Sequence, residues 1–421
     1  MNEDKTSSDP RSTGQLNRRG VLAAATAAAA SASLAAPCAA ADTPARTKPA
    51  GRKIKLGWLG CGGRGLWLAK LFRDHGGYEF TAVADYFPDL VQAFGEELGV
   101  PKARRFTGLS GYKKVLDSGP EALSILNVPC FFPEQAAAAV AAGCHVYIAK
   151  PVAVDAPGCL AIGAAGELAT RKKLCFLVDY QLPTDPVNRE VVRRVWDGGL
   201  GRLCAVTTIG QGGGANQLPD PAKGKTIAGR LRNLIWCADI PLGGDPIVNY
   251  DIHIIDAAIW ALRSRPVSAV GHARVCRPAP HGDRQDLAFI VYECPDGVLW
   301  NHQTLVLPDH GRESLACNLH GLAASARIGY DGTSFLRGGP KHFGGGKVED
   351  LYKQGAVRNI ATFYQSVVEK QCDNPTVQRA VDGTLTAILG REAAMRGVRI
   401  TMEELIKENR KLHVDLSGLD A

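Results

Sequence analysis

Two polar residues of this chain stand where a reaction at a hydroxyl group would need them. Lys150 follows an apolar run at 145–148 and precedes Pro151, and an ammonium group there can stabilise a developing alkoxide. His253 lies in a mainly apolar segment, and histidine is the natural base for a hydroxyl proton near neutral pH. Each also has an ordinary interpretation, as a surface lysine or a buried histidine, so their chemistry depends on what surrounds them.

The histidine belongs to a predicted helix with one apolar stripe. The stripe consists of Ile252, Ile255, Ile259 and Leu262. By i, i+3 and i, i+4 spacing, the neighbouring face carries Asn249, His253, Asp256 and Trp260. Asp256 is therefore expected beside His253. It is either part of a catalytic group or the partner that satisfies a buried histidine, and the spacing leaves both open.

A glycine-rich motif, GCGGRG, predicts a dinucleotide-binding loop. The motif follows a strand-like apolar run and opens a segment with helical spacing. Gly60 permits a tight turn, Gly62 lets the backbone approach a pyrophosphate, and Gly65 lets the helix pack on the strand. The N-terminus of the helix, at Gly63 and Arg64, would supply N–H donors to the phosphates.

An acidic residue follows this motif at the distance expected for a ribose ligand. Asp85 lies twenty positions after Gly65, at the end of the second apolar run. The next residues, Tyr86 and Phe87, offer no cation for a 2′-phosphate. The sequence therefore predicts NAD as the cofactor and favours it over NADP.

Short apolar runs alternate with helical segments in the first part of the chain. The runs fall at 53–59, 80–84, 122–128, 145–148 and 174–178, with helical spacing at 66–73 and 135–142. This alternation is typical of a parallel sheet that is covered on both faces. We therefore predict an α/β Rossmann domain over residues 52–180.

After about residue 182 the runs become longer and partly alternate in polarity. They fall at 203–209, 267–275, 287–294, 298–306, 315–319 and 324–328, with glycine-rich loops at 210–214 and 338–346. The turn Pro295-Asp296-Gly297 predicts an antiparallel hairpin, and closing helices are expected at 358–370, 377–396 and 401–408. We predict an α+β domain with an open, mainly antiparallel sheet over residues 181–421.

The N-terminus has the parts of an export signal. A twin arginine at 18–19 precedes an Ala-rich run, and the alanines at 39–41 offer a signal-peptidase site. Residues 1–41 are therefore predicted to be a signal peptide for the twin-arginine export machinery, which places the mature protein in the periplasm or elsewhere outside the cytoplasm. The proline before Cys38 makes lipid anchoring at that cysteine a poor prediction.

Composition excludes several other classes of protein. The 421 residues are 45% apolar and 22% charged, which is ordinary for a globular protein. Aromatic residues are 7% and the basic residues are scattered, so no nucleic-acid partner is expected. None of the twelve cysteines forms a C-x-x-C pair, so no metal is predicted. We interpret Cys61, Cys175, Cys204, Cys294 and Cys317 as small buried hydrophobes, free thiols of a chain that folds before export.

Taken together, these motifs resemble the glucose–fructose oxidoreductase/inositol dehydrogenase (Gfo/Idh/MocA) family. The matching residues are Gly60–Gly65, Asp85, Val128-Pro129, Ala142-Gly143, Lys150-Pro151 and His253 with Asp256. The resemblance covers about residues 52–410, and the segment 232–260 resembles the exported branch. It implies a nicotinamide cofactor near Val128 and Pro129, a sugar, cyclitol or polyol substrate, and homo-oligomer contacts through the open sheet. It also implies that Lys150 and His253 are catalytic.

The chain departs from the family pattern at three positions. Ala149 replaces the Glu before the lysine, Pro133 replaces a common His, and Asn249 replaces the Asp four residues before the histidine. The residues that we expect at the substrate are Asn249, Asp251 and Tyr180.

Three functions remain open on the sequence. The leading one is an NAD-dependent oxidoreductase that removes a hydride from a ring carbon. The second is a redox glycosidase, which oxidises, eliminates and reduces in turn. The third is a non-catalytic NAD-binding protein. Because free NAD is scarce outside the cytosol, an exported enzyme should carry its NAD tightly bound.

Overall fold

The computed structural model describes residues 51–212, 225–232, 235–277, 282–307 and 313–420. The predicted signal peptide at 1–41, with Cys38, lies outside the described residues, as does part of the first glycine-rich loop. Lys48–Ala421 forms one structural unit.

The first sheet has six parallel strands in the order β3-β2-β1-β4-β5-β6. The strands are β1 (Ile54–Leu59), β2 (Tyr78–Asp85), β3 (Arg105–Thr107), β4 (Ala122–Ile125), β5 (His145–Ala149) and β6 (Phe176–Asp179). This order reverses direction between β1 and β4, which is the switch point of a Rossmann sheet. The predicted α/β class is confirmed. The sequence missed β3, because three residues with one apolar side chain carry no detectable period.

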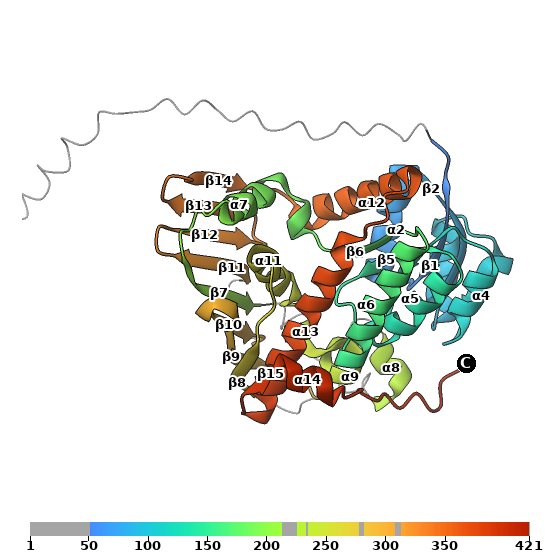
Figure 1. The fold of residues 1–421 in the computed structure, drawn as a ribbon. Coiled ribbons are helices and arrows are strands. Elements are labelled where there is room, and N and C mark those ends of the chain that lie inside the picture. The colour runs from blue at the N-terminus through green and yellow to red at the C-terminus, as the bar shows by residue number, and fades with distance from the viewer. Residues whose placement is uncertain (1–50, 213–224, 233–234, 278–281, 308–312, 421) are drawn as a thin grey trace, which may run out of the picture. The chain divides into compact units, whose positions relative to one another are not determined.

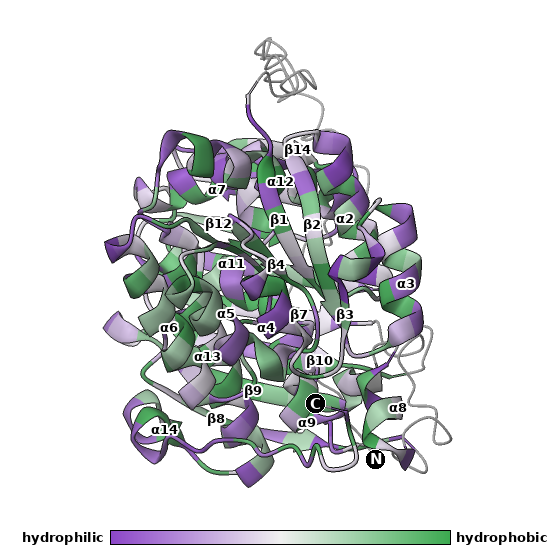
Figure 2. Cartoon of the chain, turned by 90° about the vertical axis from the view of Figure 1, so that its right-hand side faces the viewer, coloured by the Kyte–Doolittle hydropathy of each residue, from purple (hydrophilic) through white to green (hydrophobic). Residues whose placement is uncertain are grey.

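Helices cover both faces of this sheet, as Figure 1 shows. The elements α2 (Gly63–His75), α3 (Pro88–Glu97) and α12 (Leu351–Glu369) pack on one face around Trp58 and Phe72. The other face is covered by α4 (Gly111–Asp117), α5 (Phe132–Ala141) and α6 (Ala156–Arg171). The mixed colouring of α3 in Figure 2 illustrates the split between buried and solvated sides of these helices. Helix α12, from the C-terminal part of the chain, thus completes the helical layer on the face that α2 and α3 cover.

The second sheet has nine strands in the order β14-β13-β12-β11-β7-β10-β9-β8-β15. The strands are β7 (Leu203–Gln211), β8 (Ser268–Arg274), β9 (Leu287–Glu293), β10 (Leu299–Leu305), β11 (Ser314–Gly321), β12 (Ala324–Gly329), β13 (Thr333–Gly338), β14 (Phe343–Lys347) and β15 (Ile400–Thr401). All neighbours are antiparallel except β7 and β10, which confirms a mainly antiparallel sheet. The loop predicted at 338–346 is wrong in part, because Gly344, Gly345 and Gly346 lie in the strand β14, which pairs with β13.

Helices α7 (Pro186–Trp196), α11 (Ile252–Leu262) and α13 (Pro375–Arg396) cover one face of this sheet. The strand β9 illustrates the difference between the faces, because Ile290 and Tyr292 are fully buried while Phe289 and Val291 are exposed. In Figure 1 the helices lie on the inner side of the sheet only. The predicted open face is therefore present, and it carries apolar side chains.

Candidate active site

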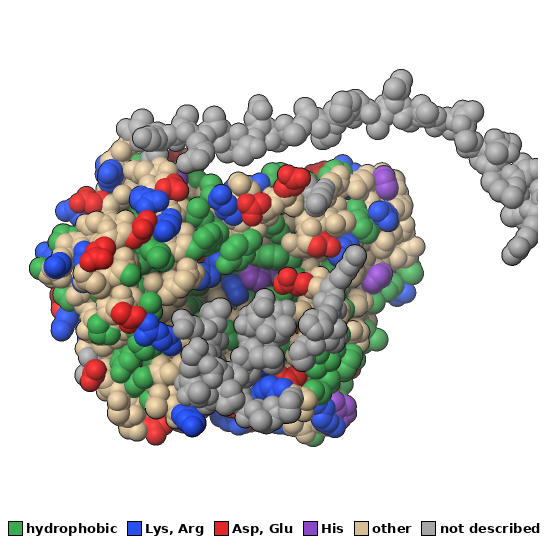
Figure 3. Space-filling model, turned by 180° about the vertical axis from the view of Figure 1, so that it is seen from behind, with side chains coloured by type: hydrophobic (Ala, Val, Ile, Leu, Met, Phe, Trp, Pro, Cys, Tyr) green, Lys and Arg blue, Asp and Glu red, His purple; other side chains and the backbone are tan. Residues whose placement is uncertain are grey.

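A cavity of about 600 Å³ lies at the carboxyl ends of the first sheet, between that sheet and the second one. Ligands bind at this edge of a Rossmann sheet because the strand order reverses there. Of the residues predicted as site residues, those that line the cavity are Gly60, Gly62, Gly63, Arg64, Gly65, Asp85, Val128, Pro129, Lys150, Asn249 and His253. Figure 3 shows this hollow, with histidine and basic side chains visible inside it.

The glycine loop is shaped for close approach of a ligand. Gly60 has φ +95°, and a Cβ there would lie 2.6 Å from the backbone of Asn127. A Cβ on Gly65 would lie 2.0 Å from the carbonyl oxygen of Gly60. By contrast, a Cβ on Gly62 or Gly63 would meet nothing within 4 Å, because these two residues face open space. The loop thus packs tightly on the protein side and leaves the helix N-terminus free for an anion.

Asp85 fixes the far end of the same loop. Its carboxylate accepts hydrogen bonds from the backbone N–H of Cys61 at 2.7 Å and of Phe87 at 3.0 Å. Burial raises the pKa of Asp85, and these N–H donors oppose the rise. The carboxylate lines the cavity and has lone pairs left for a ribose diol.

A cation absent from the local sequence reaches this end of the cavity. Arg232 follows α8 (Ile227–Leu231), and its guanidinium lies over the Phe87 ring, 4.7 Å from the centroid. It also pairs with Asp89, which accepts a hydrogen bond from it at 3.2 Å. The sequence suggested no cation here because Arg232 comes from 145 positions beyond Phe87. Its charge is shared with a carboxylate in this arrangement.

Lys150 connects the first sheet to the segment that carries the histidine. Its Nζ donates to the backbone oxygen of Asn249 at 2.7 Å. Burial, aided by the positive charge of Arg64, lowers the pKa of Lys150 to about 8, while Cys237 and Asp179 oppose that change. A lysine with this pKa is still mainly cationic at neutral pH, and it can give up its proton just above it.

The carboxylate missing at position 149 has a counterpart on the next strand. Ala149 pairs with Asp179 in the β5–β6 register. The Asp179 carboxylate binds the Arg64 guanidinium at 3.0 Å and accepts from Asn359 at 2.8 Å. Asp179 thereby holds Arg64 at the cavity wall, near Lys150.

His253 faces the cavity from the second residue of α11. Its ring lies 4.7 Å from the Tyr330 ring and edge-on to Tyr180 at 6.4 Å, measured between centroids. Nδ1 is buried without a hydrogen-bond partner. Burial, together with the positive charges of Lys150 and Arg64, holds the pKa of His253 well below its usual value. The imidazole is therefore neutral at physiological pH and able to accept a proton.

The structure does not bring Asp256 to this cavity. Asp256 is fully buried, and its Oδ1 accepts from Arg379 Nε at 2.8 Å rather than from the histidine. Its expected place beside His253 on the cavity face is therefore corrected. The expected i, i+4 relation of Asn249 and His253 also fails, because the chain forms two helices, α10 (Asp245–Asn249) and α11, that break at Tyr250.

Asp251 and Tyr180, expected at the substrate, also lie outside the cavity lining. The Asp251 carboxylate accepts from Thr304 at 2.5 Å and lies 3.2 Å from His302 Nε2, all in the interior. A Cβ at Gly210 would meet it at 1.7 Å, so a glycine is required there. Asp251 fastens the start of α11 to the second sheet and thus positions His253, while Tyr180 packs behind the histidine.

Several cavity residues were not predicted. They are Trp236, Cys237, Tyr250, Glu313, Tyr330 and Tyr352. Tyr250 donates to Glu313, and Arg64 donates to the Tyr352 hydroxyl. Apart from the neighbours Trp236 and Cys237, these residues come from different loops or helix ends, so no local period marks them. Aromatic side chains and hydrogen-bonding groups together suit a ligand with apolar faces and hydroxyl edges.

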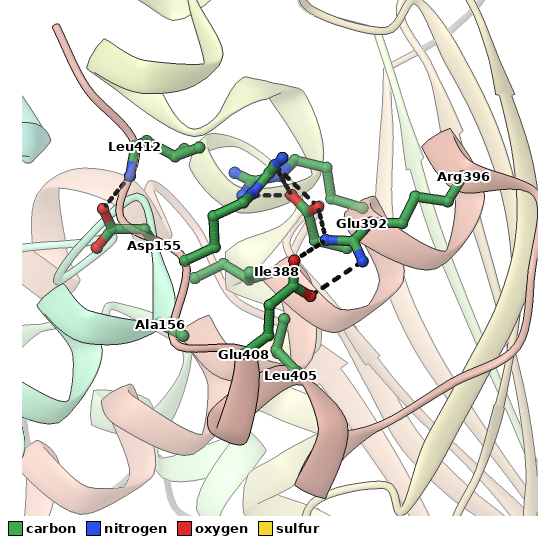
Figure 4. A pocket seen from close by; sticks show the side chains of 10 residues that line it. Asp155, Ala156, Ile388, Glu392, Arg396, Leu405, Glu408 and Leu412 are labelled. Atoms are coloured by element: carbon green, nitrogen blue, oxygen red, sulfur yellow. Dashed lines mark hydrogen bonds and ion pairs between the residues drawn. The ribbon is translucent and has the colours of Figure 1, made fainter.

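A C-terminal strap, residues 409–420, borders the Asp85 end of the cavity. The strap starts after α14 (Met402–Glu408). There Arg410 binds Glu392 at 3.1 Å, and the Leu412 N–H donates to Asp155 at 2.9 Å. These contacts lie at a small cavity of about 10 Å³, which Figure 4 shows. Its Val414 and Leu419 pack with Phe87, Phe131 and Trp236. At the far end of the strap, the Asp420 carbonyl accepts a hydrogen bond from the Leu109 N–H, and the Asp420 N–H donates to the Tyr86 hydroxyl. Leu109 and Tyr86 both line the large cavity. The strap therefore closes this side of the site.

Within the described ranges, no cluster of three or more His, Cys, Asp or Glu residues could hold a metal ion. None of the described helices is both long and apolar enough to cross a membrane.

Comparison with known proteins places this fold among oxidoreductases. No family model matches the chain. An oxidoreductase domain protein from Kribbella flavida superposes with a TM-score of 0.69 at 15% identity, over 84% of this chain and 100% of that one. An inositol dehydrogenase homolog from Azotobacter vinelandii, solved with NAD+, gives 0.66 at 17% identity over 85% and 99%. At these identities the likeness shows the fold.

A shorter likeness is seen in sequence. The "Putative UDP-kanosamine synthase oxidoreductase subunit" of Amycolatopsis mediterranei is 33% identical over 103 residues, which are 24% of this chain. The match spans 26% of that relative. The two solved structures, and not this short match, show that the chain shares their fold, which here is a Rossmann sheet followed by a mainly antiparallel one.

Proposed function

We propose that this chain is a Gfo/Idh/MocA-type, NAD-dependent oxidoreductase that acts on a sugar, cyclitol or related polyol. One observation carries the proposal: Lys150, directly after strand β5, and His253, at the start of helix α11, line the same cavity as the glycine loop. An ammonium donor and a neutral imidazole are the pair that a hydroxyl-bearing carbon needs for oxidation. The inositol dehydrogenase homolog with NAD+ and the kanosamine-related relative support the cofactor and substrate class.

The residues of the glycine loop fit the nucleotide. Gly62 and Gly63 would meet the pyrophosphate with backbone N–H groups, and Asp85 would accept hydrogen bonds from the ribose. Val128 and Pro129 line the same cavity and would contact the bound nucleotide. When bound, NAD supplies an acceptor for the hydride.

The chain's own residues handle the proton. The neutral imidazole of His253 accepts the proton of the substrate hydroxyl, and Lys150 donates a hydrogen bond to the same oxygen as it gains negative charge. Asp179 and Arg64 set the field around Lys150, and Asp251 sets the position of α11. The aromatic side chains of the cavity exclude water from the reacting carbon.

A panel of sugars, cyclitols, polyols and glycosides tests this proposal on protein loaded with NAD. With at least one compound, we expect the absorbance band of NADH to appear as the bound NAD is reduced. Release of an aglycone without net change in the nicotinamide would indicate a redox glycosidase instead. If NAD is bound and no compound of the panel reacts, the non-catalytic alternative would be favoured.

Cofactor choice gives a first prediction. NAD should bind more tightly than NADP, by roughly tenfold or more, because a 2′-phosphate would meet the buried Asp85 carboxylate. Asp85→Ser should narrow this gap by relieving the repulsion. Titration of both nucleotides into nucleotide-free protein measures the difference in affinity between NAD and NADP. The matched variant is Arg232→Ala, which removes the nearby cation. Equal affinities in the unchanged protein would contradict the role of Asp85.

Cofactor retention gives a second. Protein purified after cytosolic expression should carry NAD through gel filtration. Val414→Asp with Leu419→Asp should loosen the C-terminal strap and speed NAD release about tenfold, equivalent to about 1.4 kcal/mol of lost contacts. The control is His413→Asp, because His413 is exposed on the same strap. Release unchanged in the double variant would show that the strap does not hold the nucleotide.

We further propose that the chain is exported through the twin-arginine route and that copies pair through the open sheet. The arginines at 18–19 support the first statement. The second rests on Val270, Phe289, Val291 and Leu299, which are exposed on adjacent strands β8, β9 and β10. A monomeric mass in light scattering would contradict pairing, and cytosolic retention of the full chain would contradict export.

A further inference from the structure

Two cysteines that are far apart in the sequence lie in contact. Cys175 precedes β6, and Cys372 lies between α12 and α13, with 3.3 Å between their sulfurs. Interpreting Cys175 as a small buried hydrophobe captures its burial but misses this partner. No other sulfur pair is in contact among the described residues. We propose that Cys175 and Cys372 are a disulfide site, reduced in the cytosol and oxidised once the folded protein meets a disulfide donor.

Hydrogen bonds fix the backbone on both sides of the pair. Asn374 accepts from the Phe176 N–H at 2.7 Å and donates to the Leu174 carbonyl at 3.0 Å. The Cys175 N–H in turn donates to His145 Nδ1 at 2.8 Å. The contact is thus a property of the packed fold. A disulfide bond of about 2.05 Å requires the sulfurs to approach by little more than 1 Å, within reach of side-chain rotation.

Exposure assigns the two thiols different roles in the oxidation. Cys372 is partly exposed and Cys175 is 2% exposed, so a donor disulfide meets Cys372 first. The Cys372 thiolate attacks one sulfur of the donor and releases one donor thiol. Cys175 then loses its proton and attacks the mixed disulfide at the Cys372 sulfur, which releases the second donor thiol. Two protein thiols are oxidised to one disulfide, and the donor disulfide is reduced to two thiols.

The second step should be the slower one. Burial, together with the hydrogen bond to Cys372, raises the pKa of the Cys175 thiol, so little thiolate is present at neutral pH. The contact with Cys372 compensates, because the reaction is intramolecular and needs no diffusion.

The bond would enclose most of the second sheet in one covalent loop. The cysteines are 197 positions apart, and strands β7 to β14 all lie between them. A loop of this length restricts the unfolded chain strongly and stabilises the native state. The bond would also tie β6, which ends at Asp179, to the segment between the helices α12 and α13. We expect the apparent Tm to rise by about 5 °C on oxidation.

The full chain treated with oxidised glutathione tests this site. Non-reducing peptide mapping after thiol alkylation should find one peptide pair joined through Cys175 and Cys372, with the Tm rise reversed by dithiothreitol. Cys372→Ala and Cys175→Ala should lose both signals, and Cys372→Ala alone decides the matter if the buried variant fails to fold. Cys276→Ala is the matched control, because Cys276 is exposed and touches no other sulfur; it should keep both signals. A glutathione adduct that persists on Cys372, or no oxidised product at all, would overturn the proposal.

Discussion

Replacing His253 by glutamine should slow the reduction of bound NAD by sugar roughly 10²–10⁴-fold, the range for loss of a general base. Glutamine keeps the size and polarity of the side chain but cannot take up a proton at neutral pH. The imidazole is suited to this role because its pKa is held well below the usual value, so it is unprotonated before substrate arrives. NAD should remain bound, because His253 comes from α11, away from the glycine loop. Single-turnover absorbance with an active sugar measures the effect.

The same measurement separates His253 from the aspartate that the sequence placed beside it. Asp256→Asn should leave the single-turnover rate within a few fold, because Arg379 and not the histidine binds that carboxylate. It should instead lower the free energy of unfolding by about 1–3 kcal/mol, since Arg379 loses a charged partner. A large loss of rate in Asp256→Asn with the fold intact would restore Asp256 to the catalytic group. A near-normal rate in His253→Gln would remove the histidine from it.

The parts of the site that were predictable are those set by short-range geometry. Gly65 is required by the carbonyl oxygen of Gly60, five residues before it, and Gly60 is favoured by its positive φ, so both leave a mark in the sequence at fixed spacing. Asp85 ends a strand whose length follows from its apolar run. The two sheets were predictable for the same reason, because the apolar runs of the first sheet and the alternating polarity of the second are both local patterns.

The rest of the site depends on contacts between distant segments. The i, i+3 argument that paired Asp256 with His253 considered one helix alone, whereas Arg379 lies 123 positions away and binds the carboxylate first. Asp251, expected at the substrate, has its partners on β10 instead. Arg232 and Cys372 likewise reach their neighbours only when the chain has folded. Such pairings leave no period in the sequence.

Two of the three departures from the family pattern, Ala149 and Asn249, have a counterpart among these contacts. Ala149 removes a carboxylate, but Asp179 supplies one in register on the neighbouring strand. Asn249 cannot act as an acid or base, and it contributes its backbone oxygen to Lys150 instead. The site therefore keeps a fixed lysine and a free histidine, which is why the oxidoreductase proposal survives these substitutions.

Replacing Lys150 by methionine should slow the same single turnover roughly 10²–10³-fold, the range for loss of one preorganised donor at a developing oxyanion. Methionine nearly preserves the length of the chain but removes the charge and the hydrogen bond to Asn249. At neutral pH the methionine variant should instead have a higher free energy of unfolding than the unchanged protein. Lys150 has a folded pKa of about 8, below its ordinary 10.5, so its charge costs stability at neutral pH and this cost fades as pH rises through 8 to 10.5. The methionine variant should lack that rise.

The pH profile of the rate then tests whether the protonated lysine is the active form. Above pH 8 the ammonium loses its proton, so kcat/KM of the unchanged protein should fall along an alkaline limb near that value. No acid limb is expected near pH 6.5, because His253 is already neutral there. Lys150→Arg keeps a cation whose pKa lies far above this range, so its alkaline limb should vanish even if its maximal rate is lower. An alkaline limb that stays at pH 8 in Lys150→Arg would assign that proton to another group and leave the lysine as a mere anchor for Asn249.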